Sequence, residues 1–218
     1  MSATNNTCRS VRVPVGAVSL DGDLCIPEGA QGLVLFAHGS GSGRHSPRNR
    51  YVAGALQERR LATLLIDLLT VEEEVVDMRS GELRFDIGLL AGRLIGATDW
   101  LGTNDTTRAL RVGYFGASTG AAAALVAAAE RPAAVGAVVS RGGRPDLAAE
   151  VLPRVQVPTL LIVGGNDVPV IGMNREALAL MRAQAQLVIV PGATHLFEEP
   201  GALEEVARLA GDWFARYL

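Results

Sequence analysis

The chain contains 218 residues, of which 49% are hydrophobic and 20% are charged, and its formal net charge at pH 7 is −3. A chain of this length and composition can bury a sizeable core, so we expect one domain over residues 1–218. The slightly acidic charge and the lack of a Lys/Arg block exclude the electrostatic pattern of a nucleic-acid-binding protein and favour small-molecule substrates.

The beginning of the chain carries no targeting signal in its composition. Residues 1–9 are polar, and no apolar stretch approaches the roughly 20 residues that cross a bilayer. We therefore expect no membrane span and a cytoplasmic location. The two cysteines, Cys8 and Cys25, lack the C-x-x-C spacing, so we expect both to be reduced and without a catalytic part. Only a convenient register between the first two strands would let them meet.

Short β-rich segments then alternate with helical patterns, which is typical of a mostly parallel sheet with helices on both faces. Strands are expected at residues 11–15 and 18–26, as an antiparallel pair, and at 33–37, 62–66, 110–115, 134–140, 159–163 and 187–190. Helices are expected at residues 47–58, 85–101, 121–129 and 174–183, and from about residue 200. The first of these helices has Ser46 as its N-cap and Pro47 at its first position. The pattern predicts an α/β fold with about eight strands.

Residues 67–84 form the one long segment without a clear strand or helix pattern. Three consecutive acidic residues, Glu72 to Glu74, lie within it, and we expect a solvated loop face there. The segment is too short for a cap domain. We therefore expect a fold without a cap and a rather open site.

A candidate nucleophile lies where the strand at residues 110–115 gives way to an alanine-rich helix. Residues 116–120 read Gly-Ala-Ser-Thr-Gly, which places Ser118 on a sharp turn between strand and helix. The two glycines fit a turn so tight that a Cβ would meet the neighbouring backbone. Because the chain holds 25 glycines, this motif needs partner residues before it indicates catalysis.

A candidate acid and a candidate base follow later strands. Asp167 comes directly after the strand at residues 159–163, and His195 follows the strand at 187–190. Open α/β sheets place their ligands at the carboxyl ends of the strands, so both side chains can reach Ser118 there. A serine needs an imidazole to accept its proton, and the imidazole needs a carboxylate to orient it. The order Ser118, Asp167, His195 is that of the nucleophile-elbow hydrolases.

Acyl transfer also requires donors for the oxyanion of the tetrahedral intermediate. The glycine-rich loop at residues 38–43, after the strand at 33–37, is positioned to provide one of them. We assign the oxyanion hole to the backbone N–H groups of Ser40 and Thr119. Gly41, a possible substrate contact as well, is the alternative donor if the loop is shifted by one residue.

These four motifs, taken in order along the chain, resemble those of the α/β-hydrolase superfamily and especially its small dienelactone-hydrolase-like members. The resemblance covers nearly the whole chain, from His38 to His195. One departure is that dienelactone hydrolase itself uses a cysteine nucleophile, whereas this elbow holds Ser118. The resemblance therefore implies a serine esterase that cleaves small to medium carboxylic esters through an acyl-enzyme, without a cofactor or metal. Thioesterase, acyltransferase and perhydrolase activities would use the same residues.

The proposed triad has alternative interpretations. Ser118 is also compatible with a plain turn residue, and Asp167 with a turn former or helix cap, in which case Asp146 is the next candidate for the acid. We expect His38 to shape the oxyanion loop. We expect His45 to be a solvated residue near the mouth of the site.

Residues 141–144 read Arg-Gly-Gly-Arg and follow the strand at 134–140, so they open at the same sheet edge. Arg141 there could bind a substrate carboxylate. The alternative is a glycine-rich loop whose arginines are solvated or paired with Glu72 to Glu74.

Dinucleotide binding and a non-catalytic binding module are the two alternatives to a hydrolase. The loop at residues 39–43 followed by Asp67 outlines a dinucleotide-binding pattern, but its glycines run G-x-G-x-G and Arg44 to Pro47 separate it from the helix. A hydrolase fold without catalysis, acting as a binding module, would explain the topology. It would not explain the combination of Ser118, Asp167, His195 and the oxyanion loop. No cluster of residues has the spacing of a metal site.

Overall fold

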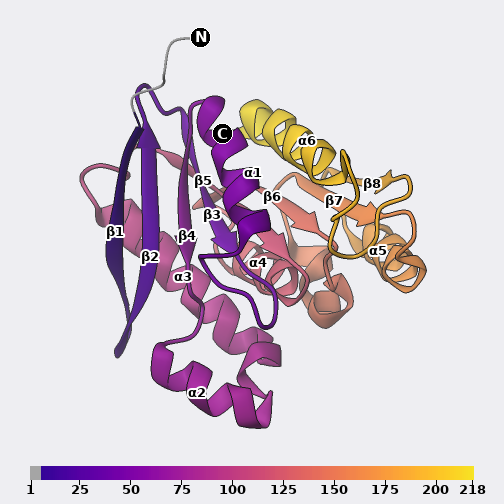
Figure 1. The fold of residues 1–218 in the computed structure, drawn as a ribbon, viewed down its shortest axis with the longest axis horizontal. Coiled ribbons are helices and arrows are strands. Elements are labelled where there is room, and N and C mark those ends of the chain that lie inside the picture. Colours follow the sequence, from indigo (N-terminus) through magenta and orange to yellow (C-terminus); the bar gives the residue numbers. More distant parts are fainter. Residues whose placement is uncertain (1–5) are drawn as a thin grey trace.

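A computed structural model describes residues 6–218. Its centre is an eight-stranded sheet with the order β1-β2-β4-β3-β5-β6-β7-β8 (Figure 1). The strands are β1 (Asn6–Val15), β2 (Val18–Pro27), β3 (Gly32–Ala37), β4 (Leu61–Ile66), β5 (Arg111–Ala117), β6 (Val135–Arg141), β7 (Thr159–Gly164) and β8 (Ala185–Val190). The β1–β2 and β2–β4 pairs are antiparallel and all other neighbours are parallel, which confirms the predicted sheet.

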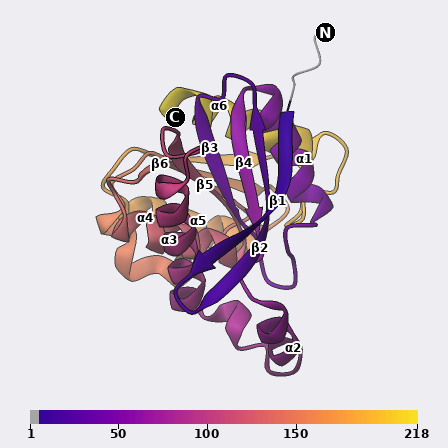
Figure 2. The same ribbon diagram turned by 90° about the vertical axis from the view of Figure 1, so that its left-hand side faces the viewer.

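Helices cover both faces of the sheet (Figure 2). One face packs against α1 (Pro47–Glu58) and α6 (Ala202–Tyr217), and the other against α3 (Ile87–Thr103), α4 (Thr119–Glu130) and α5 (Val168–Leu180). Every residue of β3 and β4 is buried, because both faces of these central strands are covered. No helix within residues 6–218 combines the length and the apolar character needed to cross a membrane.

The expected helices are present, with boundaries set by their caps. Ser46 accepts the Asn49 N–H at 3.4 Å and so begins α1 where predicted. A 3₁₀ turn, η1 (Leu83–Phe85), precedes α3, and Asp86 caps α3 by accepting the Leu89 N–H at 2.9 Å. Helix α5 begins earlier than predicted, directly after Asp167, because a proline in its first turn needs no N–H partner. A second 3₁₀ segment, η2 (Pro145–Arg154), links β6 to β7.

The prediction of reduced cysteines was wrong, because Cys8 and Cys25 form a disulfide with an S–S distance of 2.03 Å. The physical reason is the length of β1, which begins at Asn6 rather than at Val11. In the resulting register Cys8 lies directly opposite Cys25 in the antiparallel β1–β2 pair. This is the register that the sequence left open.

The prediction of an irregular loop at residues 67–84 was also wrong, because α2 (Val71–Ser80) occupies its centre. A capping box begins this helix: Thr70 Oγ1 accepts the Glu73 N–H at 3.2 Å, and Glu73 Oε2 accepts the Thr70 N–H at 2.8 Å. Gly81 ends it with a positive φ of 69°. Figure 2 shows α2 projecting beyond the ends of the strands. No cap domain is present in residues 6–218, as expected.

Candidate active site

Ser118 lies on the sharp turn between β5 and α4, with φ of 51° and ψ of −120°. A non-glycine residue at positive φ is strained, so the surrounding structure must hold it there. The flanking glycines allow this turn. A Cβ at Gly116 would lie 2.4 Å from Ala121 Cα, and one at Gly120 would lie 2.3 Å from the Ala37 carbonyl oxygen. The steric reason proposed for both glycines is therefore visible in the fold.

Asp167 and His195 are in direct contact, with 2.6 Å between Asp167 Oδ2 and His195 Nδ1. The carboxylate side chain is 13% exposed and the imidazole 40% exposed, so the imidazole has one side open to solvent. Asp167 precedes the first residue of α5 but forms no side-chain cap there. Its carboxylate is therefore directed to the histidine rather than to the helix.

The loops that carry this pair are tied to each other through Asn166. Its backbone N–H donates to the Ala193 carbonyl at 2.9 Å, and its side-chain amide donates to the Gly192 carbonyl at 2.8 Å. Gly165 adds a hydrogen bond from its N–H to the Val190 carbonyl at 2.8 Å. Three hydrogen bonds between the two loops thus hold the carboxylate against the imidazole.

The loop after β6 connects Ser118 with His195. Ser118 donates its N–H to the Arg141 carbonyl at 3.2 Å and accepts the Arg144 N–H at 3.1 Å. A Cβ at Gly142, in the same loop, would lie 3.4 Å from the His195 imidazole. No hydrogen bond joins the Ser118 hydroxyl to His195 within the described part of the chain. Such contacts often tighten only when substrate binds.

The two predicted oxyanion residues lie side by side, because the Ser40 and Thr119 hydroxyls are 3.0 Å apart. Thr119 is the first residue of α4, where the N–H has no partner within the helix. Neither its N–H nor that of Ser40 reaches an acceptor within residues 6–218. A Cβ at Gly39 would lie 3.1 Å from Ser118 Cβ, so the loop passes close to Ser118. Gly41, the alternative donor, is exposed and has φ of 68°.

His38 is buried and uses both ring nitrogens on the main chain. Its Nδ1 donates to the Gly39 carbonyl at 3.0 Å, and its Nε2 accepts the Leu68 N–H at 2.9 Å. Burial lowers the pKa of His38 below its usual value, so the ring stays neutral. It has no nitrogen left to accept a proton from serine. His45 is exposed, at the rim of the cavity described below.

Asp146 and Arg141 are the two charged residues near the site for which the sequence left alternative roles open. Asp146 forms an ion pair with Arg144 at 2.8 Å, which holds the pKa of that carboxyl below its usual value. Arg141 is neither solvated nor paired with the glutamates of α2. It is buried 6.0 Å from the centre of the Phe115 ring, and its Nη1 has no hydrogen-bond partner among residues 6–218. Burial, with the nearby positive charge of Arg48, lowers the pKa of Arg141 to about 10.

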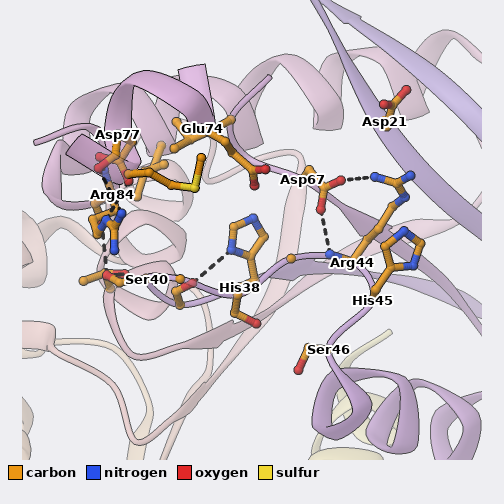
Figure 3. Close-up of a pocket in the computed structure, with 18 of the residues that line it drawn as sticks. Asp21, His38, Ser40, Arg44, His45, Ser46, Asp67, Glu74, Asp77 and Arg84 are labelled. Carbon is orange, nitrogen blue, oxygen red and sulfur yellow. Dashed lines mark hydrogen bonds and ion pairs between the residues drawn. The ribbon is translucent and has the colours of Figure 1, made fainter. Parts of the chain in front are cut away.

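A cavity of about 710 Å³ is lined by Ser40 and Thr119, the two predicted oxyanion residues. Figure 3 shows the cavity, with Ser40 labelled. The size of the cavity lies within the roughly 300–1,000 Å³ of small-molecule sites. The loop from His38 to Arg48 forms one wall, and α2 with Arg84 forms the other. At the far end Asp67 accepts the Arg44 backbone N–H at 2.7 Å and contacts its guanidinium. Sequence reasoning missed the α2 wall, although the Thr70–Glu73 spacing of a capping box was available as a signal.

Known proteins resemble this chain closely. A crystal structure of dienelactone hydrolase from Anabaena variabilis ATCC 29413 is 66% identical, with a TM-score of 0.96 over 98% of this chain and 99% of that one. Est1E from Butyrivibrio proteoclasticus shares the fold, with a TM-score of 0.77 at 14% identity over 95% of this chain and 98% of that one.

Two Mycobacterium tuberculosis proteins, from strains CDC 1551 and H37Rv, are 59% identical over 95% of this chain, and both are named "putative phosphoribosyl transferase". This chain spans only 46% of the length of each. The model of the dienelactone hydrolase family matches residues 86–218, which carry Ser118, Asp167 and His195. With this match and the Anabaena structure, the chain belongs to the dienelactone hydrolase family.

Proposed function

We propose that this protein is a serine hydrolase that cleaves small to medium carboxylic esters through an acyl-enzyme. Membership of the dienelactone hydrolase family supports a hydrolase activity. The observation that carries the finer proposal is the Asp167–His195 contact at 2.6 Å, at the same sheet edge as a serine held in a strained elbow. A protein that only binds a ligand would not need an Asp–His contact at the same sheet edge as a strained serine.

In the proposed reaction the Ser118 hydroxyl attacks the ester carbonyl while His195 Nε2 accepts its proton. Asp167 fixes the ring so that Nδ1 keeps its proton and Nε2 faces the serine. The backbone N–H groups of Ser40 and Thr119 stabilise the oxyanion, each for roughly 3 kcal/mol. His195 then gives the proton to the leaving alcohol. A water molecule cleaves the acyl-enzyme by the same steps, which regenerates Ser118.

Hydrolysis of a p-nitrophenyl ester by the native protein and by Ser118→Ala tests this proposal. We expect the variant to keep its fold and lose nearly all turnover, because the remaining site lacks a nucleophile. Labelling of Ser118 by a phosphonate probe is the matched measurement. Equal turnover in the variant would refute the proposal, and a native protein that is neither active nor labelled would favour a binding module.

We also propose that Arg141, which is not among the residues lining the cavity beside Ser40 and Thr119, contributes to the binding of a carboxylate on the alcohol part of a substrate. The support for this is that the guanidinium is buried and has no carboxylate partner in the described part of the chain, because such a charge is costly unless an anion compensates it. Arg141→Met should raise KM for esters whose alcohol part carries a carboxylate and leave KM for uncharged esters unchanged. Equal effects on both ester types would show that Arg141 acts only on the packing of the loop.

We do not propose the phosphoribosyl transferase activity that the mycobacterial relatives' names give, because this chain matches only 46% of their length. Thioesterase, acyltransferase and perhydrolase reactions use the same residues, and assays that vary the acceptor and the leaving group distinguish these activities.

A single domain and a cytoplasmic location stay predictions. The Cys8–Cys25 disulfide removes one of the arguments for that location.

A further inference from the structure

Helix α2 has its polar side turned to the protein. Asp77 is buried and forms an ion pair with Arg84 at 2.6 Å, and it also accepts the Arg84 backbone N–H at 3.1 Å. Glu73 forms an ion pair with Arg93 of α3 at 2.5 Å. Helices on a globular protein usually bury an apolar face instead. The attachment of α2 therefore leaves its apolar side chains without a partner in the core.

The apolar side of α2 is a stripe of Val71, Val75 and Met78, which follow one another at helical spacing. Their exposed fractions are 65%, 45% and 73%. Val71 and Met78 line the cavity, together with the buried side chains of Leu69 and Leu90. The stripe thus supplies apolar surface to the cavity, and an apolar ligand there would remove it from water.

The cavity begins at the reaction centre but lies on one side of it. Ser40 and Thr119 line it, so a carbonyl whose oxygen lies at their N–H groups is at its entrance. Ser118 and His195 are not among its lining residues. The leaving alcohol must stay within reach of His195, which gives it a proton. The part of the ester that extends from the carbonyl into this cavity is therefore the acyl chain.

The charges around the cavity favour an uncharged chain. Three arginines line the cavity, and each already has a carboxylate partner: Arg44 contacts Asp67, Arg48 contacts Glu198 and Arg84 contacts Asp77. Glu74 lines the cavity and forms no ion pair within residues 6–218. Figure 3 shows Glu74 and Asp77 on the α2 side, across from His38 and Ser40. A terminal carboxylate on the acyl chain would meet Glu74 without a compensating cation.

We propose that the cavity under α2 is the acyl subsite, and that Val71 and Met78, the two stripe residues that line it, select esters of uncharged, medium-length aliphatic acids. This inference rests on the proposed function, because it names the substrate class of the same site. The stripe is a specificity determinant, whereas Ser118, Asp167 and His195 carry out the chemistry.

Two ester series test the inference. One varies the acyl chain from acetate to octanoate with p-nitrophenol as the constant leaving group, and the other varies the alcohol of acetate esters from ethyl to octyl. We expect kcat/KM to rise about fourfold for each methylene added to the acyl chain, until the cavity is filled. The alcohol series should show a much weaker dependence on length.

Met78→Ser should lower the ratio of octanoate to acetate kcat/KM roughly tenfold. Val76→Ser is the matched control, because Val76 is a 57% exposed residue of the same helix that does not line the cavity. Both positions are exposed, so neither change disturbs the core. A Met78→Ser enzyme with the native ratio, or an equal loss in both variants, would overturn the inference.

A hexanoyl ester and the half ester of adipic acid test the preference for an uncharged chain. We expect at least roughly tenfold slower turnover of the acidic ester, and we expect Glu74→Gln to narrow this gap. Equal turnover of the two esters would overturn this preference. Ser118-dependent turnover of acetate with a flat acyl-length profile would refute the acyl subsite alone. Absence of Ser118-dependent turnover for every ester would refute the proposed function and the inference together.

Discussion

Acid pH should destabilise this protein through His38. The folded protein holds this ring neutral, since Nε2 accepts the Leu68 N–H and burial lowers the pKa of the ring. The unfolded chain binds a proton at His38 below about pH 6.5. The unfolded state therefore binds more protons than the folded state in acid, so the stability from His38 is present above about pH 6.5 and is lost as the pH falls below it.

The size of this effect follows from the linkage relation. The free energy of unfolding should fall by up to about 1.4 kcal/mol for each pH unit below pH 6.5, which amounts to at most about 2 kcal/mol at pH 5. His38→Gln removes the titrating group and retains an amide that can accept the Leu68 N–H. Urea unfolding of both proteins at pH 8, 7, 6 and 5 measures the effect. If the native protein and the variant show parallel pH dependence over this range, His38 is not held neutral by the fold.

Three further changes test the elbow, the disulfide and the acid. Gly120→Ala should destabilise the protein by about 3 kcal/mol in urea unfolding, because its Cβ would meet the Ala37 carbonyl oxygen, whereas Gly54→Ala in α1, where a Cβ meets nothing within 4 Å, should not destabilise it. Cys8→Ser should lower the free energy of unfolding by about 3 kcal/mol, as expected for a bridge between residues 17 positions apart, and reductant should no longer affect thermal unfolding; an unchanged midpoint would contradict a stabilising bridge. Asp167→Asn should reduce kcat by about 10⁴ with the fold intact, and a loss below tenfold would exclude Asp167 as the residue that orients His195.

The sequence was sufficient to place the residues of the candidate site at the ends of strands. Ser118, Asp167 and His195 each follow a short apolar segment, and segments of this kind are recognisable without tertiary information. Their meeting at one sheet edge follows from the parallel arrangement. The contact between Asp167 and His195 is therefore an outcome that residue order and strand positions could predict.

The sequence was insufficient where the outcome depends on pairing between distant segments. Cys8 lies outside the five-residue β pattern that begins at Val11, and only the full β1–β2 register brings it opposite Cys25. In α2 the three glutamates suggested a solvated loop. Only Glu73 has an ion-pair partner, Arg93, which lies on another helix. The sequence around α2 therefore could not predict this ion pair or the exposure of the apolar stripe. The cavity depends on that orientation and was missed for the same reason.

The residues of the candidate site follow strands in two different parts of the sheet. Ser118 and the loop carrying Ser40 follow central strands, β5 and β3, which have hydrogen-bonded neighbours on both sides. Asp167 and His195 follow β7 and β8, and β8 is the outermost strand of the sheet. A distortion at that margin would displace the imidazole as a unit with its carboxylate, because the Asn166 hydrogen bonds join their loops. An insertion after β8 would therefore move the Asp167–His195 pair while Ser118 and the loop that carries Ser40 keep their positions.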